Sequence, residues 1–459
     1  MNRLYLKVFF VFVLALGVWG GTFYLKNYTN KFEPQKILEN SILKERNFAP
    51  KVLEVKGEDN LVAYLIKENS VPLVSITFGF DRMGRSFEPF YGTGNIWEVV
   101  ALDGAKDWDR KELRSLMKEK GIKIGISVDR DEMVVKFSYV KEFEREAFEV
   151  LKAVLFEPRL DEKDILVAKD MLVAAQRKDS ERVQSKLNKL YLEKFFKNHR
   201  LGREKYALKE DLDKIDAGVI RNYLAQGMAK DVLEIGVSGD IDENGVREFL
   251  KFMFADLREK SEIKELEEFV PSYNNEVFEI DVPSSKQSFV LMTTKSVARN
   301  DKDFYPFYVA DFVFGGAGLN SRLNKVMREE NGLTYGIYSY MNLSKMLNTW
   351  NVMWSASPKN TKKIEELFEK EYKNFVENGI TEDELLMAKN SLLSSFNLRF
   401  NSLFSISEQL YYIKRENLGR DFLEKRQGVI AGIELVDVNR VIRKGGEFKV
   451  FRVNGGGLI

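Results

Sequence analysis

The sequence predicts a mixed α+β protein with two tandem homologous domains, each a mostly antiparallel sheet packed against several helices, preceded by an N-terminal apolar helix. Three observations lead to this prediction. Short apolar strands and long amphipathic helices occur in separate runs along the 459 residues, which is typical of α+β proteins. A helix-opening motif occurs twice, at 160–172 and at 380–392. An uncharged apolar segment stands near the start of the chain.

The apolar segment covers residues 8–25 and follows two positive charges, Arg3 and Lys7. Its length is close to the minimum for a membrane-spanning helix, and preceding positive charges favour an N-in orientation. A cleaved signal peptide, with Val18 and Gly20 at an acceptable cleavage site, is the alternative. We therefore expect residues 1–26 to be a signal anchor or a signal peptide. Both interpretations place the rest of the chain outside the cytoplasm, either anchored to the cytoplasmic membrane or free in the periplasm.

After a polar spacer at 27–44, strand and helix signals alternate through the first half of the chain. Short apolar runs with turn signals between them predict strands at 51–57, 61–70, 72–84 and 231–241, and a hairpin at 122–140. Amphipathic periodicity predicts helices at 107–121, at about 141–156 and at 161–197.

The repeated motif indicates an internal duplication. LDEKDILVAKDML (160–172) aligns with ITEDELLMAKNSL (380–392), and each segment opens as a capped helix. Asp161 and Thr381 are the expected N-caps, with Asp164 and Glu384 three residues further on, as in a capping box. We therefore predict related domains at 45–258 and 274–459, joined by a charged linker at 259–273.

Composition excludes several classes of function. The chain has no cysteine and a single histidine, His199, so zinc sites that need two or three of these residues have too few ligands. His199 has charged neighbours and is expected at the surface end of a helix. With 71 Lys+Arg against 70 Asp+Glu, the chain lacks the basic excess typical of nucleic-acid-binding proteins. The aromatic-rich segments 304–314 and 399–413 are expected to form core or a subunit interface, rather than a cofactor site.

Two longer motifs carry a family resemblance that covers nearly everything after residue 45. The segments GTGNIWEVVALDGAKDWDRKELRSLMKEKGIKI (92–124) and GLNSRLNKVMREENGLTYGIYSYMN (318–342) resemble the insulinase, pitrilysin and mitochondrial processing peptidase family. Active members carry the inverted zinc motif His-x-x-Glu-His in the first segment, with the Glu as general base. The matching positions here are Asn95, Ile96, Trp97, Glu98 and Val99.

The resemblance fails at the metal ligands. Asn95 and Val99 replace both zinc histidines, and only Glu98, the position of the base, is kept. The family's distant zinc-binding Glu would fall near Ala174 or Ala175, with Glu181 the nearest acid. We therefore expect neither zinc nor another cofactor in this chain, and no peptidase activity from the chain alone.

The second motif is complete, and the resemblance assigns a role to Arg328 and Tyr335. In the family the Arg binds the substrate and the Tyr hydroxyl stabilises the oxyanion, which is sound transition-state chemistry. Nearby, Gly315, Gly316 and Gly318 are expected in a turn with unusual φ angles leading into a helix. A role of these glycines in gating substrate is the alternative.

These features predict the non-catalytic subunit of an extracytoplasmic zinc metallopeptidase heterodimer. A zinc-binding paralogous subunit would supply the metal and the base, and this chain would close the chamber and contribute Arg328 and Tyr335. The substrates implied are extended peptides bound along strand edges. The alternatives are a scaffold subunit of a membrane complex, similar to the zinc-less core proteins of the respiratory chain, and a peptide-binding protein without catalysis.

Overall fold

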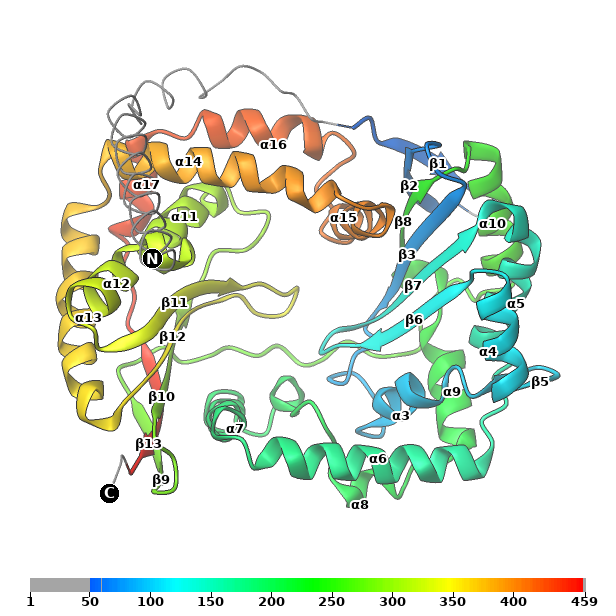
Figure 1. Cartoon of the computed structure of the whole chain (residues 1–459), viewed down its shortest axis with the longest axis horizontal. Helices are drawn as coiled ribbons and strands as arrows, with labels where there is room; N and C mark the ends of the chain where they lie inside the picture. Colours follow the sequence, from blue (N-terminus) through cyan, green and yellow to red (C-terminus); the bar gives the residue numbers. More distant parts are fainter. Residues whose placement is uncertain (1–49, 59, 457–459) are drawn as a thin grey trace, which may run out of the picture. The chain divides into compact units, whose positions relative to one another are not determined.

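A computed structural model describes residues 50–58 and 60–456 (Figure 1). The predicted apolar helix at 8–25 and the spacer at 27–44 lie outside the described residues, so the membrane anchor stays a prediction. Among the helices of the described part of the chain, none combines the length and the apolar character needed to cross a membrane. The fold is mixed α+β, as predicted, with two large sheets and many helices.

The first sheet has six strands in the order β1-β2-β8-β3-β7-β6. All neighbours are antiparallel except β2 and β8, and Ile76 on β3 lies opposite Phe137 on one side and Val237 on the other. The strands confirm each predicted strand and the predicted hairpin of the first half. They are β1 (Leu53–Lys56), β2 (Val62–Lys67), β3 (Leu73–Asp81), β6 (Lys123–Val128), β7 (Glu132–Val140) and β8 (Leu233–Gly239).

The second sheet repeats this arrangement. Its order, β11-β12-β10-β13-β9, matches β6-β7-β3-β8-β2 strand for strand, and its one parallel pair, β13 with β9, corresponds to β8 with β2. The strands are β9 (Val277–Val282), β10 (Ser288–Lys295), β11 (Thr334–Asn342), β12 (Thr349–Ala356) and β13 (Lys449–Gly455). A duplication would produce this match, while the predicted domain boundaries stay a prediction.

Helices cover both sheets (Figure 1). Those of the first half are α3 (Thr93–Val100), α4 (Arg110–Glu119), α5 (Glu144–Phe156), α6 (Glu162–Ser180), α7 (Val183–Phe196), α8 (Lys209–Leu212), α9 (Ala217–Gly227) and α10 (Glu243–Phe254). A short hairpin, β4 (Gly104–Ala105) and β5 (Trp108–Asp109), precedes α4. Those of the second half are α11 (Phe304–Asp311), α12 (Arg322–Asn324), α13 (Pro358–Asn378), α14 (Glu382–Phe396), α15 (Leu403–Arg415), α16 (Phe422–Ala431) and α17 (Leu435–Ile442).

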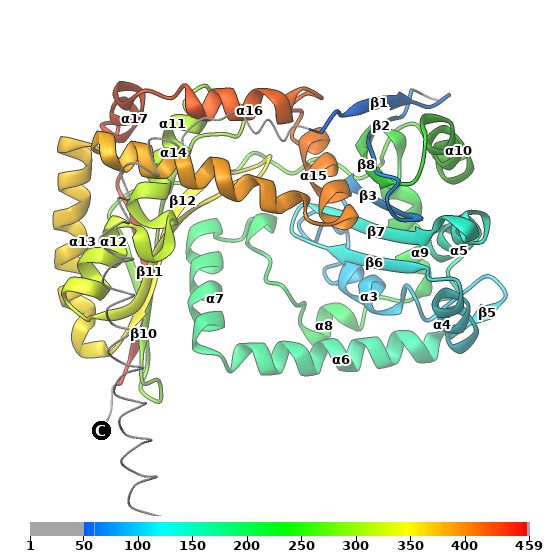
Figure 2. The ribbon, with the colours of Figure 1, turned by 45° about the horizontal axis from the view of Figure 1, so that its top comes forward.

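The prediction of one helix over 161–197 is wrong. The structure has two helices, because Arg182 adopts an extended conformation (φ −74°, ψ 133°) between α6 and α7. This break lets α7 turn away from α6 and pack against strands of the second sheet (Figure 2). There it buries Tyr191 against Phe451 of β13, with the two ring centroids 5.2 Å apart. A straight continuation of α6 could not make this contact.

The helix-opening motif is confirmed in one of its two copies. Thr381 forms a full capping box with Glu384 at the start of α14. Asp161 stands at the N-cap position of α6 but makes no capping hydrogen bond with its side chain. Its carboxylate instead lies 3.1 Å from the guanidinium of Arg159. The capping box predicted at Asp161 and Asp164 is therefore wrong, because a cation in the preceding loop attracts the N-cap carboxylate.

The two halves exchange one helix each. Helix α15, which follows α14 as α7 follows α6, packs against β8, β3 and β2 of the first sheet, while α7 packs against β13, β10 and β9. At the α15 contact the Ser407 hydroxyl lies 3.1 Å from that of Ser75 and 2.9 Å from that of Thr77. Close by, the Tyr411 hydroxyl donates to the Glu132 carboxylate at 2.5 Å. Segment 399–413 therefore contributes to the core, as predicted.

Candidate functional site

The segment that matches the zinc motif lies on α3, and a buried carboxylate organises the start of this helix. The Glu88 side chain accepts hydrogen bonds from the backbone N–H of Gly92 (2.7 Å) and of Gly94 (2.8 Å). It is fully buried, and this desolvation raises its pKa. A Cβ at Gly94 would lie 2.5 Å from the carboxylate, so only glycine fits there. Glu88 thus satisfies two of the backbone donors that a helix N-terminus leaves unpaired.

Arginines fix the loop that carries Glu88. Arg203 donates to the backbone carbonyls of Arg85 (2.7 Å) and Glu88 (2.9 Å), and Arg200 also donates to the Glu88 carbonyl. The Tyr91 hydroxyl donates to the Glu204 carbonyl at 2.5 Å. This cluster was not predicted from the sequence. Its only sequence signal is one acidic residue in an otherwise uncharged run ahead of the Gly-Thr-Gly turn.

The two histidine positions of the motif hold side chains that do not suit zinc. Asn95 is buried, and its Oδ1 has no hydrogen-bond partner within the described chain. Val99 packs against the hydrophobic core. Glu98 is exposed. Partial burial of its carboxylate raises its pKa, and a hydrogen bond from the Val128 backbone offsets part of this rise. An amide and an isopropyl group cannot replace two imidazoles, so these residues do not fit a catalytic zinc ion.

The position that corresponds to the family's distant zinc-binding Glu also has no metal-binding side chain. Ala174 and Ala175 lie on α6, which packs against α3, and Glu181 is exposed beyond the last residue of α6. Across residues 50–58 and 60–456, no group of three or more potential metal-binding side chains comes together.

The single histidine has a structural role. His199 follows the end of α7, as predicted, but its side chain is half-buried. Its Nδ1 accepts from the Leu201 backbone N–H at 3.2 Å, its Nε2 lies 3.1 Å from the Glu267 carbonyl oxygen, and its ring centroid is 5.3 Å from that of Phe269. These contacts connect the end of α7 to the segment that joins the two halves.

The second motif forms a braced β-bulge. The buried Asn324 side chain donates to the Ile337 carbonyl (2.6 Å) and accepts from the Ile337 N–H (3.2 Å). The pairing of β11 with β12 is irregular between Thr334 and Ile337, and the Thr334 hydroxyl donates to the Ser355 carbonyl at 2.7 Å. Bulges often reorient a side chain next to a functional site.

The structure brings Arg328 and Tyr335 together at this bulge. Arg328 Nη1 donates to the Tyr335 backbone carbonyl at 2.9 Å. The Tyr335 side chain is 82% exposed on β11, an edge strand of the second sheet. The bulge backbone is therefore held in place while the phenol projects into solvent. The roles assigned to both residues stay predictions.

The prediction for the three glycines is right only for Gly318, whose φ is +60°. Gly315 and Gly316 have negative φ and belong to a π-helical turn, Phe312–Gly316. At Gly315 the requirement is space, because a Cβ would lie 2.5 Å from the backbone nitrogen of Ser339 on β11.

Comparison with known proteins assigns the family. The model for insulinase, peptidase family M16, matches residues 82–207, and the model for the peptidase M16 inactive domain matches residues 214–392. The first match includes the Asn95–Val99 segment, and the second includes Arg328 and Tyr335. The chain belongs to the insulinase family of peptidases and their homologues, as the resemblance implied.

Individual relatives agree with this assignment. Non-peptidase homolog YmxG of Helicobacter pylori is 25% identical over 356 residues, covering 77% of this chain and 81% of the relative. The peptidase M16 inactive domain from Pseudomonas fluorescens has the same fold, with a TM-score of 0.81 at 17% identity, covering 89% of this chain and 98% of that one. The periplasmic protease PqqL from Escherichia coli gives a TM-score of 0.77 at 10% identity, covering 89% of this chain and 46% of that one.

Proposed function

We propose that this chain is the non-catalytic subunit of an extracytoplasmic zinc metallopeptidase heterodimer. A paralogous subunit of the same family supplies the zinc ion and the general base. This chain closes the chamber, binds extended peptide, and contributes Arg328 and Tyr335 to the reaction in trans. The observation that carries the proposal is the braced bulge, which holds both residues together and presents the phenol to solvent.

The two motifs differ in the residues they retain, and this difference supports an enzyme whose active site is divided between two subunits. The first motif has an amide and an aliphatic side chain in place of two metal ligands, whereas the second keeps both residues that act on substrate. A tyrosine with 82% of its side chain exposed adds little to folding. Its hydroxyl can, however, stabilise a developing oxyanion, and its loss would leave that charge without a preorganised donor.

The length of the protease PqqL supports a two-subunit assembly. This chain spans about half the length of the protease PqqL, so that protein has room for a second region of comparable size. A separate zinc-bearing chain would supply the equivalent of that second region here. A periplasmic location, either free or through an anchor at residues 8–25, is part of the proposal.

Peptide binding fits the edge of the second sheet. Strand β11 is an edge strand, so those backbone groups of its outer row that Asn324 and Arg328 do not already bind could pair with an added strand. An extended substrate on this edge would pass the phenol of Tyr335, which β11 itself carries.

Reconstitution tests the proposal. The full chain is produced alone, with a paralogue that carries His-x-x-Glu-His, or mixed with it after purification. Size-exclusion chromatography measures complex formation, and cleavage of an unfolded fluorogenic peptide measures activity. We expect a 1:1 complex that hydrolyses the peptide and loses activity with a zinc chelator, while each subunit alone is inactive. A paralogue that is fully active alone, with this chain adding only stability, would support the scaffold alternative instead.

A further inference from the structure

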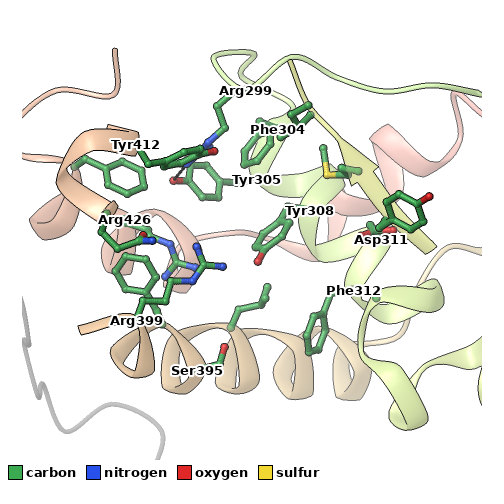
Figure 3. Close-up of a pocket in the computed structure, with 18 of the residues that line it drawn as sticks. Arg299, Phe304, Tyr305, Tyr308, Asp311, Phe312, Ser395, Arg399, Tyr412 and Arg426 are labelled. Carbon is green, nitrogen blue, oxygen red and sulfur yellow. Dashed lines mark hydrogen bonds between the residues drawn. The ribbon is translucent and has the colours of Figure 1, made fainter. Parts of the chain in front are cut away.

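The second half of the chain contains a cavity of about 390 Å³ where α11, α14, α15 and α16 meet (Figure 3). Neither Arg328 nor Tyr335 lines it. Three arginines do, namely Arg299, Arg399 and Arg426. We call this cavity the arginine pocket. Its volume falls in the range of small-molecule sites.

Arg426 is the most unusual of the three arginines. Its side chain is 6% exposed, and its Nη1 has no hydrogen-bond partner within the described chain. Its Cζ lies 3.8 Å from the centroid of the Phe396 ring, so its guanidinium stacks on an aromatic face. A buried guanidinium keeps its charge, and an unpaired buried donor is unfavourable. The unmet hydrogen-bonding capacity points to a missing acceptor.

The positive charges of the three arginines in the pocket are unbalanced. Within the described residues, no carboxylate lies within salt-bridge distance of Arg299, Arg399 or Arg426. Figure 3 shows the guanidinium groups of Arg399 and Arg426 entering from the same side of the cavity. Burial, together with the nearby charges of Arg399 and Arg299, lowers the pKa of Arg426 to about 10. Like charges gathered without a counterion favour the binding of an anion.

Among the described residues that line the pocket, Asp311 is the only carboxylate, and its Oδ1 already has two hydrogen-bond donors. Asp311 lies at the opposite end of the view in Figure 3. Its Oδ1 accepts from the Ser339 hydroxyl (2.5 Å) and from the Trp350 indole N–H (2.6 Å). Asp311 therefore does not neutralise Arg399 and Arg426.

Aromatic side chains complete the wall. Phe304, Tyr305 and Tyr308 come from α11, and Tyr412 comes from α15. Arg299 stacks on Phe304, with its Cζ 4.1 Å from the ring centroid, and donates to the Tyr305 hydroxyl at 3.4 Å. A ligand with an apolar body and a charged end would match both parts of the wall.

We propose that the arginine pocket binds a small organic anion, with a phosphate or carboxylate group held by Arg399 and Arg426 and its body against Phe304, Tyr305 and Tyr308. Guanidinium groups suit both oxyanions, because their planar N–H donors match the oxygen geometry. This site is independent of the proposed peptidase role, since it contains neither residue of the Arg–Tyr motif.

Thermal unfolding of the full chain tests the proposal. The probes are inorganic phosphate, pyrophosphate and citrate, each titrated at constant ionic strength with sodium chloride as the reference. We expect at least one oxyanion to raise Tm saturably, because a ligand that binds only the folded state stabilises it. A response to phosphates alone indicates a phosphorylated ligand, and a response to citrate alone indicates a carboxylate. No saturable rise beyond the chloride reference with any of the three would overturn the proposal.

Two variants make the assignment specific. Arg426→Met removes the buried charge, so we expect a higher Tm without anion and no anion-dependent rise. Arg399→Gln removes the charge but keeps a polar side chain, and it is expected to weaken anion binding on the order of tenfold or more, because one charge-assisted contact is lost. Arg420→Met, an exposed position outside the pocket, should keep the wild-type response. An anion-dependent rise that survives in Arg426→Met and Arg399→Gln, or a lower Tm of anion-free Arg426→Met, would overturn the assignment.

Discussion

Buried carboxylates in this protein differ in the groups that hold them. Glu88 accepts from two backbone N–H groups of α3, and Glu132 is paired with Arg415 at 2.7 Å and with the Tyr411 hydroxyl. Within the described part of the chain, Asp311 accepts side-chain hydrogen bonds from two neutral donors, Ser339 and Trp350. Burial raises the pKa of all three carboxylates, and at Asp311 it raises the pKa from 3.8 to about 6.

This shift predicts a pH-dependent stability that Asp311→Asn removes. The folded protein holds the Asp311 proton up to about pH 6, whereas the unfolded chain releases it near pH 3.8. The folded state thus binds more protons between these values, and the contribution of Asp311 to stability is lost as pH rises through 6. Between pH 4.5 and pH 7.5, urea unfolding of the wild type should lose on the order of 2 kcal/mol more than unfolding of Asp311→Asn.

Asparagine is a suitable replacement because its Oδ1 can still accept from Ser339 and Trp350. The exposed Asp107→Asn is the matched control and should keep the wild-type pH dependence. An Asp311→Asn variant with the same pH dependence as the wild type would show that Asp311 is ionised throughout this range.

The sequence revealed the residues of the second motif better than these buried acids. Arg328 and Tyr335 were predicted from a spaced motif, and the structure places them in contact. Asp311 could have been found, since it is the one charged residue in the apolar run 304–314. Glu88 had a weaker signal, because its role depends on the turn at Gly92 (φ +98°), which a sequence does not display.

At the scale of elements, the exchange of α7 and α15 holds the halves together. Helix α15 lies very close to the first sheet, and glycines make this possible. A Cβ at Gly236 of β8 would lie 2.3 Å from the Ser407 carbonyl oxygen and 2.4 Å from the Tyr411 nitrogen. Both of these are backbone atoms of α15, so they could move only if the helix moved.

Gly236→Ala should therefore separate α15 from the sheet. We expect a loss of about 3 kcal/mol or more in the free energy of unfolding, because the overpacking is against a rigid backbone. Urea denaturation followed by circular dichroism measures this loss. Gly125→Ala on the exposed edge strand β6, where the nearest atom is Lys136 Cβ at 4.0 Å, is the control and should cost little. Similar stabilities for the two variants would contradict the close contact of α15.

Periodicity predicted the elements but not their partners. The strands of the first sheet were all expected, because alternation and turn residues are local signals. The break between α6 and α7 was missed, since no glycine or proline marks it and the contacts that require it lie in the second sheet. An apolar helix face shows that something covers it, without showing which sheet does so.

For the whole molecule, the two halves share a five-strand sheet order but differ in their chemistry. The first half keeps the helix of the zinc motif around Asn95 and Val99, and the second half presents Tyr335 on a braced edge strand. The scarcity of histidine already indicated this division, because composition limits metal sites regardless of the fold. The partner, in contrast, could only be inferred from the family resemblance.

The most direct test of the central claim is the turnover of Tyr335→Phe in the assembled heterodimer. The substitution removes only the hydroxyl of an exposed side chain, so assembly and stability should not change. We predict that kcat and kcat/KM fall together, on the order of 100- to 1000-fold, because the donor acts in the transition state. Tyr338→Phe on the same strand should retain wild-type turnover. Unchanged turnover in Tyr335→Phe would contradict the catalytic contribution of this chain and favour a scaffold.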